Sequence, residues 1–245
     1  MNNLVVLGAT SAIAEQVARL YAKPDQHILL VARNQDGLNV ISKDLFVRGA
    51  GKVDTLTYDF SNLDGIQSLV DSIAGKMDKI DILFVAYGTL PNQQACEKDV
   101  EQVQSEINLN FVSIVSVITG LSPLMVQKGA GTIAVITSVA GDRGRKSNYI
   151  NGTVKGALTV YLQGLRNSLF AKGVHVLTIK PGFVDTPMTV DFKKGLLWAK
   201  PEKIAKDIVN AITRKKDVIY TPWFWRWIML IIKLIPERIF KKMNL

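Results

Sequence analysis

The sequence predicts an α/β fold: a doubly wound parallel sheet in three layers, forming a single domain over 1–222 with an apolar helical tail over 223–245. Short runs rich in β-branched residues alternate with longer amphipathic segments, as in successive βαβ units. The length of 245 residues, with 48% hydrophobic and 21% charged residues, suits one sizeable globular core.

The predicted strands are near-continuous apolar runs, which are typical of parallel strands covered on both faces. They occupy 4–8, 27–32, 53–59, 80–86, 131–137 and 174–180, and the helices between them occupy 12–22, 35–48, 62–75, 99–128 and 150–171. In 62–75 apolar residues recur every three or four positions, and "SNLDG" supplies a capping residue at its start. Ligands of such sheets bind beyond the carboxyl ends of the strands, so the segments after each strand carry the functional information.

Composition excludes several classes of site. Cys96 is the only cysteine, which rules out an internal disulfide, fits a reducing cytosol and indicates a small inert side chain. His27 and His175 are the only histidines, and each lies beside an apolar run, so we expect no metal site.

The net charge of +9 favours an anionic partner, such as a phosphate-bearing ligand or an acidic membrane surface. No basic stripe interleaved with aromatic residues occurs in the globular part, so we do not expect nucleic-acid binding. The N-terminus runs directly into a strand and leaves no room for a signal peptide. We therefore expect a cytoplasmic location, at the inner face of the cell membrane if the tail contacts lipid.

A dinucleotide site is predicted at the turn "GATSAIAEQVA" after the first strand. Backbone N–H groups and a helix dipole favour a pyrophosphate there, which gives a Rossmann-like site. The residues expected at this site are Gly8, Thr10, Ser11, Ala12 and Ile13. Of the three glycines of the usual fingerprint only Gly8 is present, because Ala12 and Ala14 occupy the other two places, so a plain strand–helix turn is the alternative.

The second strand ends at Ala32 and Arg33, where a cofactor without a 2′-phosphate usually meets an acidic residue. A guanidinium pairs well with a 2′-phosphate, so the sequence favours NADP(H) over NAD(H). After the third strand, Asp59 and Phe60 are placed to contact the adenine, although Asp59 suits equally a cap for the next helix.

Four further motifs follow in order: "NLNFVSI" with Asn110, "ITSVAG" with Ser138, "VKGAL" with Lys155, and "KPGFVDTPM". Together with the glycine turn they resemble the short-chain dehydrogenase/reductase family over residues 1–222. The resemblance implies a general-acid tyrosine, a lysine that lowers its pKa and holds the ribose, a serine that orients the carbonyl, and an asparagine that supports a water relay. It implies cofactor contacts at Gly88, Lys155, Pro181, Gly182, Val184 and Thr186. It also implies a homodimer or homotetramer formed through 99–128 and 150–171.

The acid of that scheme is missing. On an α-helix, residues four apart share a face, and four residues before Lys155 stands Asn151. Tyr149 is six residues before Lys155, roughly 120° round the helix. The predicted catalytic residues are therefore Asn110, Ser138, Asn151 and Lys155. An amide cannot give up a proton to an alkoxide, so we expect Asn151 to impair carbonyl reduction. The alternatives are rescue by Tyr149, or an NADP(H)-binding pseudoenzyme acting as a partner or sensor.

The chain departs from the family in a second place, since "VAYG" (85–88) keeps only Gly88 of the usual strand-four motif. The segments "GATSAIAEQVARLYA" and "SVAGDRGRKSNY" are similar to a divergent branch, the decaprenyl-phosphoryl-2-keto-ribose reductases. That similarity implies a keto-sugar on a lipid phosphate, with a lipid ketone as the runner-up substrate class. Arg143, Arg145 and Lys146 either face the phosphate or form a solvated loop.

The segment from Trp223 to Ile235 is almost entirely apolar but too short to span a bilayer. Its three tryptophans and the basic residues that follow suit a helix lying in a membrane interface. Packing on the sheet or in a subunit interface is the alternative.

Overall fold

A computed structural model describes residues 2–243; Met1, Asn244 and Leu245, at the ends of the two predicted ranges, lie outside it. Within 2–243 the sheet has seven parallel strands in the order β3-β2-β1-β4-β5-β6-β7. The strands are β1 (Asn2–Leu7), β2 (Gln26–Ala32), β3 (Lys52–Thr57), β4 (Ile82–Val85), β5 (Gly131–Ile136), β6 (Val174–Pro181) and β7 (Val218–Thr221). This arrangement confirms the predicted doubly wound α/β fold, and the order reverses between β1 and β4, where such sheets bind ligands.

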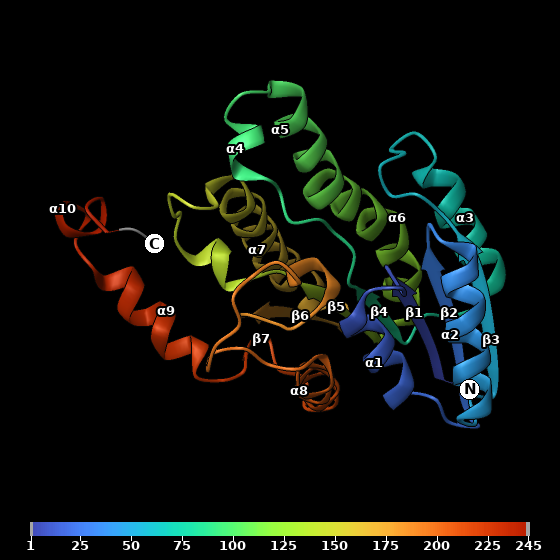
Figure 1. Cartoon of the computed structure of the whole chain (residues 1–245). Helices are drawn as coiled ribbons and strands as arrows, with labels where there is room; N and C mark the ends of the chain where they lie inside the picture. The colour runs from blue at the N-terminus through green and yellow to red at the C-terminus, as the bar shows by residue number, and fades with distance from the viewer. Residues whose placement is uncertain (1, 244–245) are drawn as a thin grey trace.

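Helices cover both faces of the sheet, which makes three layers (Figure 1). One face carries α1 (Ala12–Leu20), α2 (Gln35–Val47) and α8 (Pro201–Thr213). The other carries α3 (Ile66–Lys76), α6 (Ser113–Lys128) and α7 (Tyr149–Phe170). Successive strand residues alternate between the two cores: Leu4 and Val6 pack under α1, while Val5 and Leu7 pack on the opposite side.

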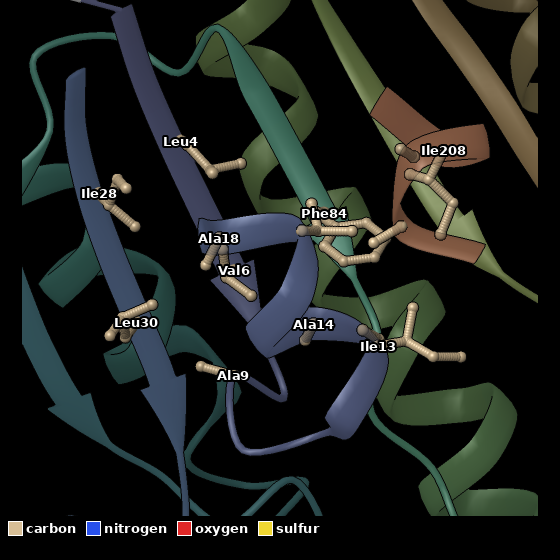
Figure 2. Packing of buried hydrophobic residues seen from close by; sticks show 14 of the residues in the cluster. Leu4, Val6, Ala9, Ile13, Ala14, Ala18, Ile28, Leu30, Phe84 and Ile208 are labelled. Atoms are coloured by element: carbon tan, nitrogen blue, oxygen red, sulfur yellow. The ribbon is translucent and has the colours of Figure 1, made fainter. Parts of the chain in front are cut away.

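The first helix lies close to the sheet because its inward face is small. Figure 2 shows Ala14 and Ala18 of α1 above Leu4 and Val6 of β1, with Phe84 of β4 beside them. Ala14 is completely buried. An alanine in place of the fingerprint's third glycine therefore still permits tight packing of the helix behind the ligand turn.

The helix predicted over 62–75 begins later, at Ile66, and that prediction of its start was wrong. Gly65 occupies the N-cap position without a side-chain cap, and Asn62 instead accepts a hydrogen bond from the Gly65 N–H (3.3 Å) within the preceding turn. The polar "SNLDG" stretch forms a turn before the helix because its side chains bond locally to the backbone.

The region predicted as one helix over 99–128 comprises α5 (Val100–Ile107), a π-helical turn η1 (Asn108–Val112) and α6. By length and composition this run is apolar enough to cross a membrane, with a mean hydropathy of 1.8 in its most apolar window. In its second half, Ile114, Val117 and Leu121 are fully buried against the sheet and α3. It is a core helix, and the π turn at its centre places Asn110 at the site described below.

Several described elements lie outside the predicted set. β7 and α8 complete the sheet edge and one helical layer, and α4 (Gln93–Cys96) is a short helix after β4. Two 3₁₀ turns, η2 (Val139–Asp142) and η3 (Pro187–Thr189), follow β5 and β6. The chain ends in α9 (Trp225–Leu234) and α10 (Glu237–Phe240), which lie at the side of the molecule remote from α2 and β3 (Figure 1).

Candidate active site

The predicted site residues gather at one edge of the sheet. Because the strands are parallel, the residues that follow their carboxyl ends meet along this edge. Each strand from β1 to β6 contributes at least one of them: Gly8, Arg33, Asp59, Gly88, Ser138 and Gly182.

The turn after β1 is built for close approach of a ligand. Gly8 has a φ of +83°, and a Cβ placed on it would lie 2.6 Å from Tyr87 Cβ, so only glycine fits. Thr10 is exposed, and Ser11 precedes α1 without bonding its side chain to the first turn of that helix. The N–H groups at the start of α1, at Ala12 and Ile13, are thus left without a side-chain cap, as an anion site requires.

The edge at β2 and β3 carries the charges expected at an adenosine phosphate. Arg33 is exposed and lies near Asp59, and the Ser61 N–H and the Arg33 guanidinium both lower the pKa of Asp59. Asp59 accepts a hydrogen bond from the Ser61 N–H (3.0 Å), so it caps a turn and does not cap α3. The Phe60 ring is buried and stacks on Tyr87 at 3.7 Å between centroids, so this side chain packs in the core.

Asn110 forms the centre of a polar cluster beside Gly88. It is 1% exposed, and its Oδ1 accepts a hydrogen bond from the Thr89 N–H (2.8 Å). Its Nδ2 donates to Thr89 Oγ1 (2.8 Å) and to Glu106 Oε2 (2.9 Å). A Cβ added at Gly88 would lie 2.6 Å from Asn110 Oδ1 and 3.4 Å from Lys155 Nζ, so the amide and the ammonium converge on this glycine.

Asn151 and Lys155 lie one turn apart near the start of α7, and each is 7% exposed. The predicted register holds, because α7 begins at Tyr149 and is helical throughout the segment. Burial lowers the pKa of Lys155 to about 8, and the Glu106 carboxylate opposes that shift. The structure therefore keeps the lysine in a desolvated position, with the Asn151 amide one turn before it.

Tyr149 lies elsewhere. It is 41% exposed at the first position of α7, on the side of α4, where Glu97 and Gln93 are its neighbours. Desolvation and the Glu97 carboxylate raise the pKa of Tyr149 above its ordinary value. Gln93 also accepts a hydrogen bond from the Ile150 N–H (3.0 Å), so this corner holds α4 against α7.

Ser138 precedes a loop that is packed tightly on α7. Its Oγ accepts a hydrogen bond from the Ala140 N–H (3.0 Å). A Cβ at Gly141 would lie 2.6 Å from the Gly156 nitrogen, and one at Gly152 would lie 3.0 Å from the Ala140 oxygen. These glycines let the loop and the helix touch, which fixes Ser138 relative to Asn151.

The loop after β6 is held from both sides. Gly182 lies against the indole of Trp225, since a Cβ there would lie 1.9 Å from Trp225 Nε1. Val184 pairs with Ala199 in an isolated bridge, and the Thr186 N–H donates to Thr189 Oγ1 (3.2 Å). The loop that starts at Pro181 is therefore shaped by contacts that the sequence motif alone did not reveal.

A second cluster anchors the Ser138 loop to the sheet edge. Asp142 is paired with Lys180, and it accepts a hydrogen bond from the Tyr220 hydroxyl (2.7 Å). Burial and the Asp142 carboxylate raise the pKa of Tyr220 well above its ordinary value. Sequence reasoning missed this cluster, because Asp142 and Tyr220 are 78 positions apart.

Both alternatives given for Arg143, a phosphate ligand or part of a solvated loop, were wrong. Its guanidinium donates to the carbonyls of Ile232 (2.5 Å) and Ile235 (2.7 Å), and it pairs with Glu237 (2.9 Å). It also lies 3.7 Å from the centre of the Phe240 ring. These carbonyls at the end of α9 need donors, and Arg143 supplies them.

Arg145 lies on the same loop. Its Nε is buried without a hydrogen-bond partner among residues 2–243, and desolvation lowers the pKa of Arg145. Lys146 beside it is exposed. Over the same described range, no cluster of three or more His, Cys, Asp or Glu side chains has a geometry suited to a metal ion.

The fold and this strand-end edge define a dinucleotide-binding α/β oxidoreductase. The chain belongs to the short chain dehydrogenase family, which it matches over residues 2–196. An uncharacterised oxidoreductase of Mycobacterium tuberculosis is 31% identical over 240 residues, covering 98% of this chain and 96% of that protein.

Two solved structures share the fold. A short-chain dehydrogenase from Sphingobium yanoikuyae, in complex with NADPH, has a TM-score of 0.84 at 21% identity, covering 97% of both chains. L-sorbose reductase from Gluconobacter frateurii, complexed with NADPH and L-sorbose, has a TM-score of 0.80 at 23% identity, covering 89% of this chain and 94% of that one.

Proposed function

We propose that this chain is an NADP(H)-dependent ketone reductase whose proton-transfer step is impaired because Asn151 occupies the place of the acid. The observation that carries the proposal is the placement of Asn151 and Lys155 one turn apart, both buried, while Tyr149 is exposed and faces α4. An amide at this position donates a hydrogen bond to a substrate oxygen but does not release a proton at neutral pH.

The residues present fit a nicotinamide dinucleotide. The side-chain-free turn at Gly8 and the uncapped start of α1 suit a pyrophosphate, and exposed Arg33 suits a 2′-phosphate. Both solved relatives named above were obtained with NADPH, which supports the same preference here. When bound, the reduced cofactor supplies a hydride to the carbonyl carbon.

The other residues have roles in binding and orientation. Ser138 offers a hydroxyl to the carbonyl oxygen, and the ammonium of Lys155 holds the ribose and adds positive charge beside the developing alkoxide. Asn110 is held by Glu106 and Thr89, so it keeps the backbone at Gly88 in position behind Lys155. The step that lacks a residue is proton transfer to the alkoxide, because the Asn151 amide cannot supply that proton.

For the substrate we propose a ketone carried on a lipid phosphate, such as a keto-sugar, in line with the decaprenyl-phosphoryl-2-keto-ribose reductases that the sequence resembles. The supporting observation is Arg145, whose partly buried guanidinium lacks a carboxylate partner among the described residues and lies on the loop between Ser138 and Asn151. An apolar ketone without phosphate is the second substrate class, and it predicts no effect of Arg145→Gln on KM.

A pseudoenzyme that binds NADP(H) and signals to a partner is the second candidate function, and Asn151 favours it. The two functions are separated by titrating NADPH against the chain and the Asn151→Tyr variant, then assaying both with a panel of ketoses and acyl ketones. Turnover by the variant supports the reductase. Tight NADPH binding with no turnover by either protein supports the pseudoenzyme, and failure to bind NADPH contradicts both.

A further inference from the structure

The last long helix, α9, has two apolar faces. One face packs on the body: Trp225 and Met229 are buried with Val139 of the Ser138 loop, and Ile228 and Ile232 lie partly buried beside them. The opposite face is apolar but uncovered, with exposures between 41% and 72% at Trp227, Leu230, Ile231 and Leu234. Their spacing of three, one and three residues places them on one stripe of the helix. Trp223, 69% exposed, lies in the turn just before the helix.

The exposed stripe is not needed to hold the segment in place. Trp225 is anchored against Gly182, and Arg143 binds the carbonyls that end α9. Large apolar side chains on a rigid, exposed stripe are costly in water unless a partner covers them. The stripe therefore marks an interaction surface.

A second exposed apolar segment lies outside α9. The loop after β6 exposes Met188, Val190, Phe192, Leu196 and Leu197, among which Lys193 and Lys194 are interspersed. Phe183 links this loop to the packed face of α9, because its ring lies 5.0 Å from Trp225 and 5.3 Å from Trp198 between centroids. This loop follows Pro181 and Gly182 at the candidate site, so the apolar surface borders the site's entrance.

The charges around the stripe identify the partner. Residues 223–243 carry five cations and a single carboxylate, Glu237, which Arg143 already neutralises. The cations are Arg226, Lys233, Arg238, Lys241 and Lys242. A second copy of this chain would present the same cations and repel, whereas anionic lipid headgroups attract them while the tryptophans enter the interface.

We propose that the α9–α10 arm and the 188–197 loop dock this protein onto an anionic lipid bilayer, with the exposed stripe in the headgroup region. The docking does not depend on the reductase activity. Where the proposed function also holds, the site entrance faces the lipid surface, which suits an apolar or lipid-linked ketone.

Sedimentation with vesicles of phosphatidylcholine, with and without phosphatidylglycerol, tests the docking. The full chain is expected to bind the anionic vesicles and to dissociate as salt is raised. Trp227→Gln with Ile231→Gln is expected to weaken binding about tenfold or more. Lys241→Gln with Lys242→Gln is expected to weaken it about 20- to 30-fold.

Phe46→Gln with Val47→Gln on α2 is the matched control, since these residues are equally apolar and exposed but lie at the other side of the molecule. This control is expected to bind like the unchanged chain. Circular dichroism and NADPH titration establish that each variant is folded.

Three results would overturn the docking: no binding to anionic vesicles, equal binding after the Trp227 and Ile231 changes, or an equal loss in the α2 control. Light scattering can give a fourth such result. If the unchanged chain is a dimer that does not bind vesicles, and the Trp227 and Ile231 changes convert it to a monomer, the stripe is a contact between two copies.

Discussion

At the scale of single residues, burial of the Lys155 ammonium lowers the stability of the native state by an amount that depends on pH. Its pKa in the native state is about 8, below the ordinary 10.5, because the side chain is desolvated. Below about pH 8 the native state holds a buried ammonium, and the penalty is fully present. As pH rises from about 8 towards 10.5 the native lysine is neutral while the unfolded one still binds a proton, so stability rises and the penalty is relieved.

The Lys155→Met variant measures this cost. Without cofactor it is expected to be more stable than the unchanged chain by roughly 3 kcal/mol near pH 7, and by less than about 1 kcal/mol near pH 10. Urea unfolding at the two pH values gives both differences. Lys172→Met, at an exposed position after α7, serves as the control. If the difference in free energy of unfolding between Lys155→Met and the unchanged chain stays constant with pH, Lys155 is not desolvated in the native state.

We propose that Arg33 sets the choice between NADPH and NADH. Arg33→Ala is expected to raise the Kd for NADPH about tenfold or more, because a charge-assisted hydrogen bond to the 2′-phosphate is lost. The Kd for NADH is expected to change by less than about twofold, since NADH lacks that phosphate. Fluorescence titration measures both constants. Arg48→Ala is the control, because Arg48 pairs with Asp44 at the far end of α2, and an equal loss for NADH would contradict the assignment.

At the scale of elements, the residues after Ser138 join three parts of the molecule. Asp142 binds Lys180 and Tyr220 of the sheet edge, and Arg143 binds the end of α9. The arm and the candidate site therefore share one loop. A change in the arm is expected to reach the site through Trp225 and Gly182.

Arg143→Gln tests how the arm is held on the Ser138 loop. The variant leaves the terminal carbonyls of α9 without their main donor, so the α9–α10 junction is expected to open more often and be cut faster by a protease. Limited proteolysis followed by mass spectrometry locates the cuts, expected within 233–243. Arg214→Gln, at the exposed end of α8, is the control. Unchanged cleavage in Arg143→Gln would mean that the Trp225 face alone holds the arm.

The sequence predicted the elements whose signals are local, and missed those that depend on distant contacts. Near-continuous apolar runs located the core strands, and the four-residue spacing from Lys155 placed Asn151 on the same helix face. The short edge strand β7 has weak alternation and gains its place from pairing with β6. The role of Arg143 was misjudged because its partners lie 89 to 94 positions away.

At the scale of the whole molecule, the function proposed above makes the fold, the cofactor edge and the buried lysine the scaffold of a reductase that lacks a proton donor at Asn151. Restoring a phenol at position 151 is therefore expected to restore catalysis without altering the scaffold. The Kd for NADPH should then be the same, within about twofold, for the chain and the Asn151→Tyr variant.

The most direct test is the rate of NADPH oxidation by the chain and by Asn151→Tyr at saturating NADPH with the same ketone, each with and without Tyr149→Phe. We predict a rise of at least about 10²-fold on introducing the tyrosine, unaffected by Tyr149→Phe. No rise with any ketone that the site accepts, or a loss of the residual rate on Tyr149→Phe alone, would contradict the claim that Asn151 occupies the place of the acid.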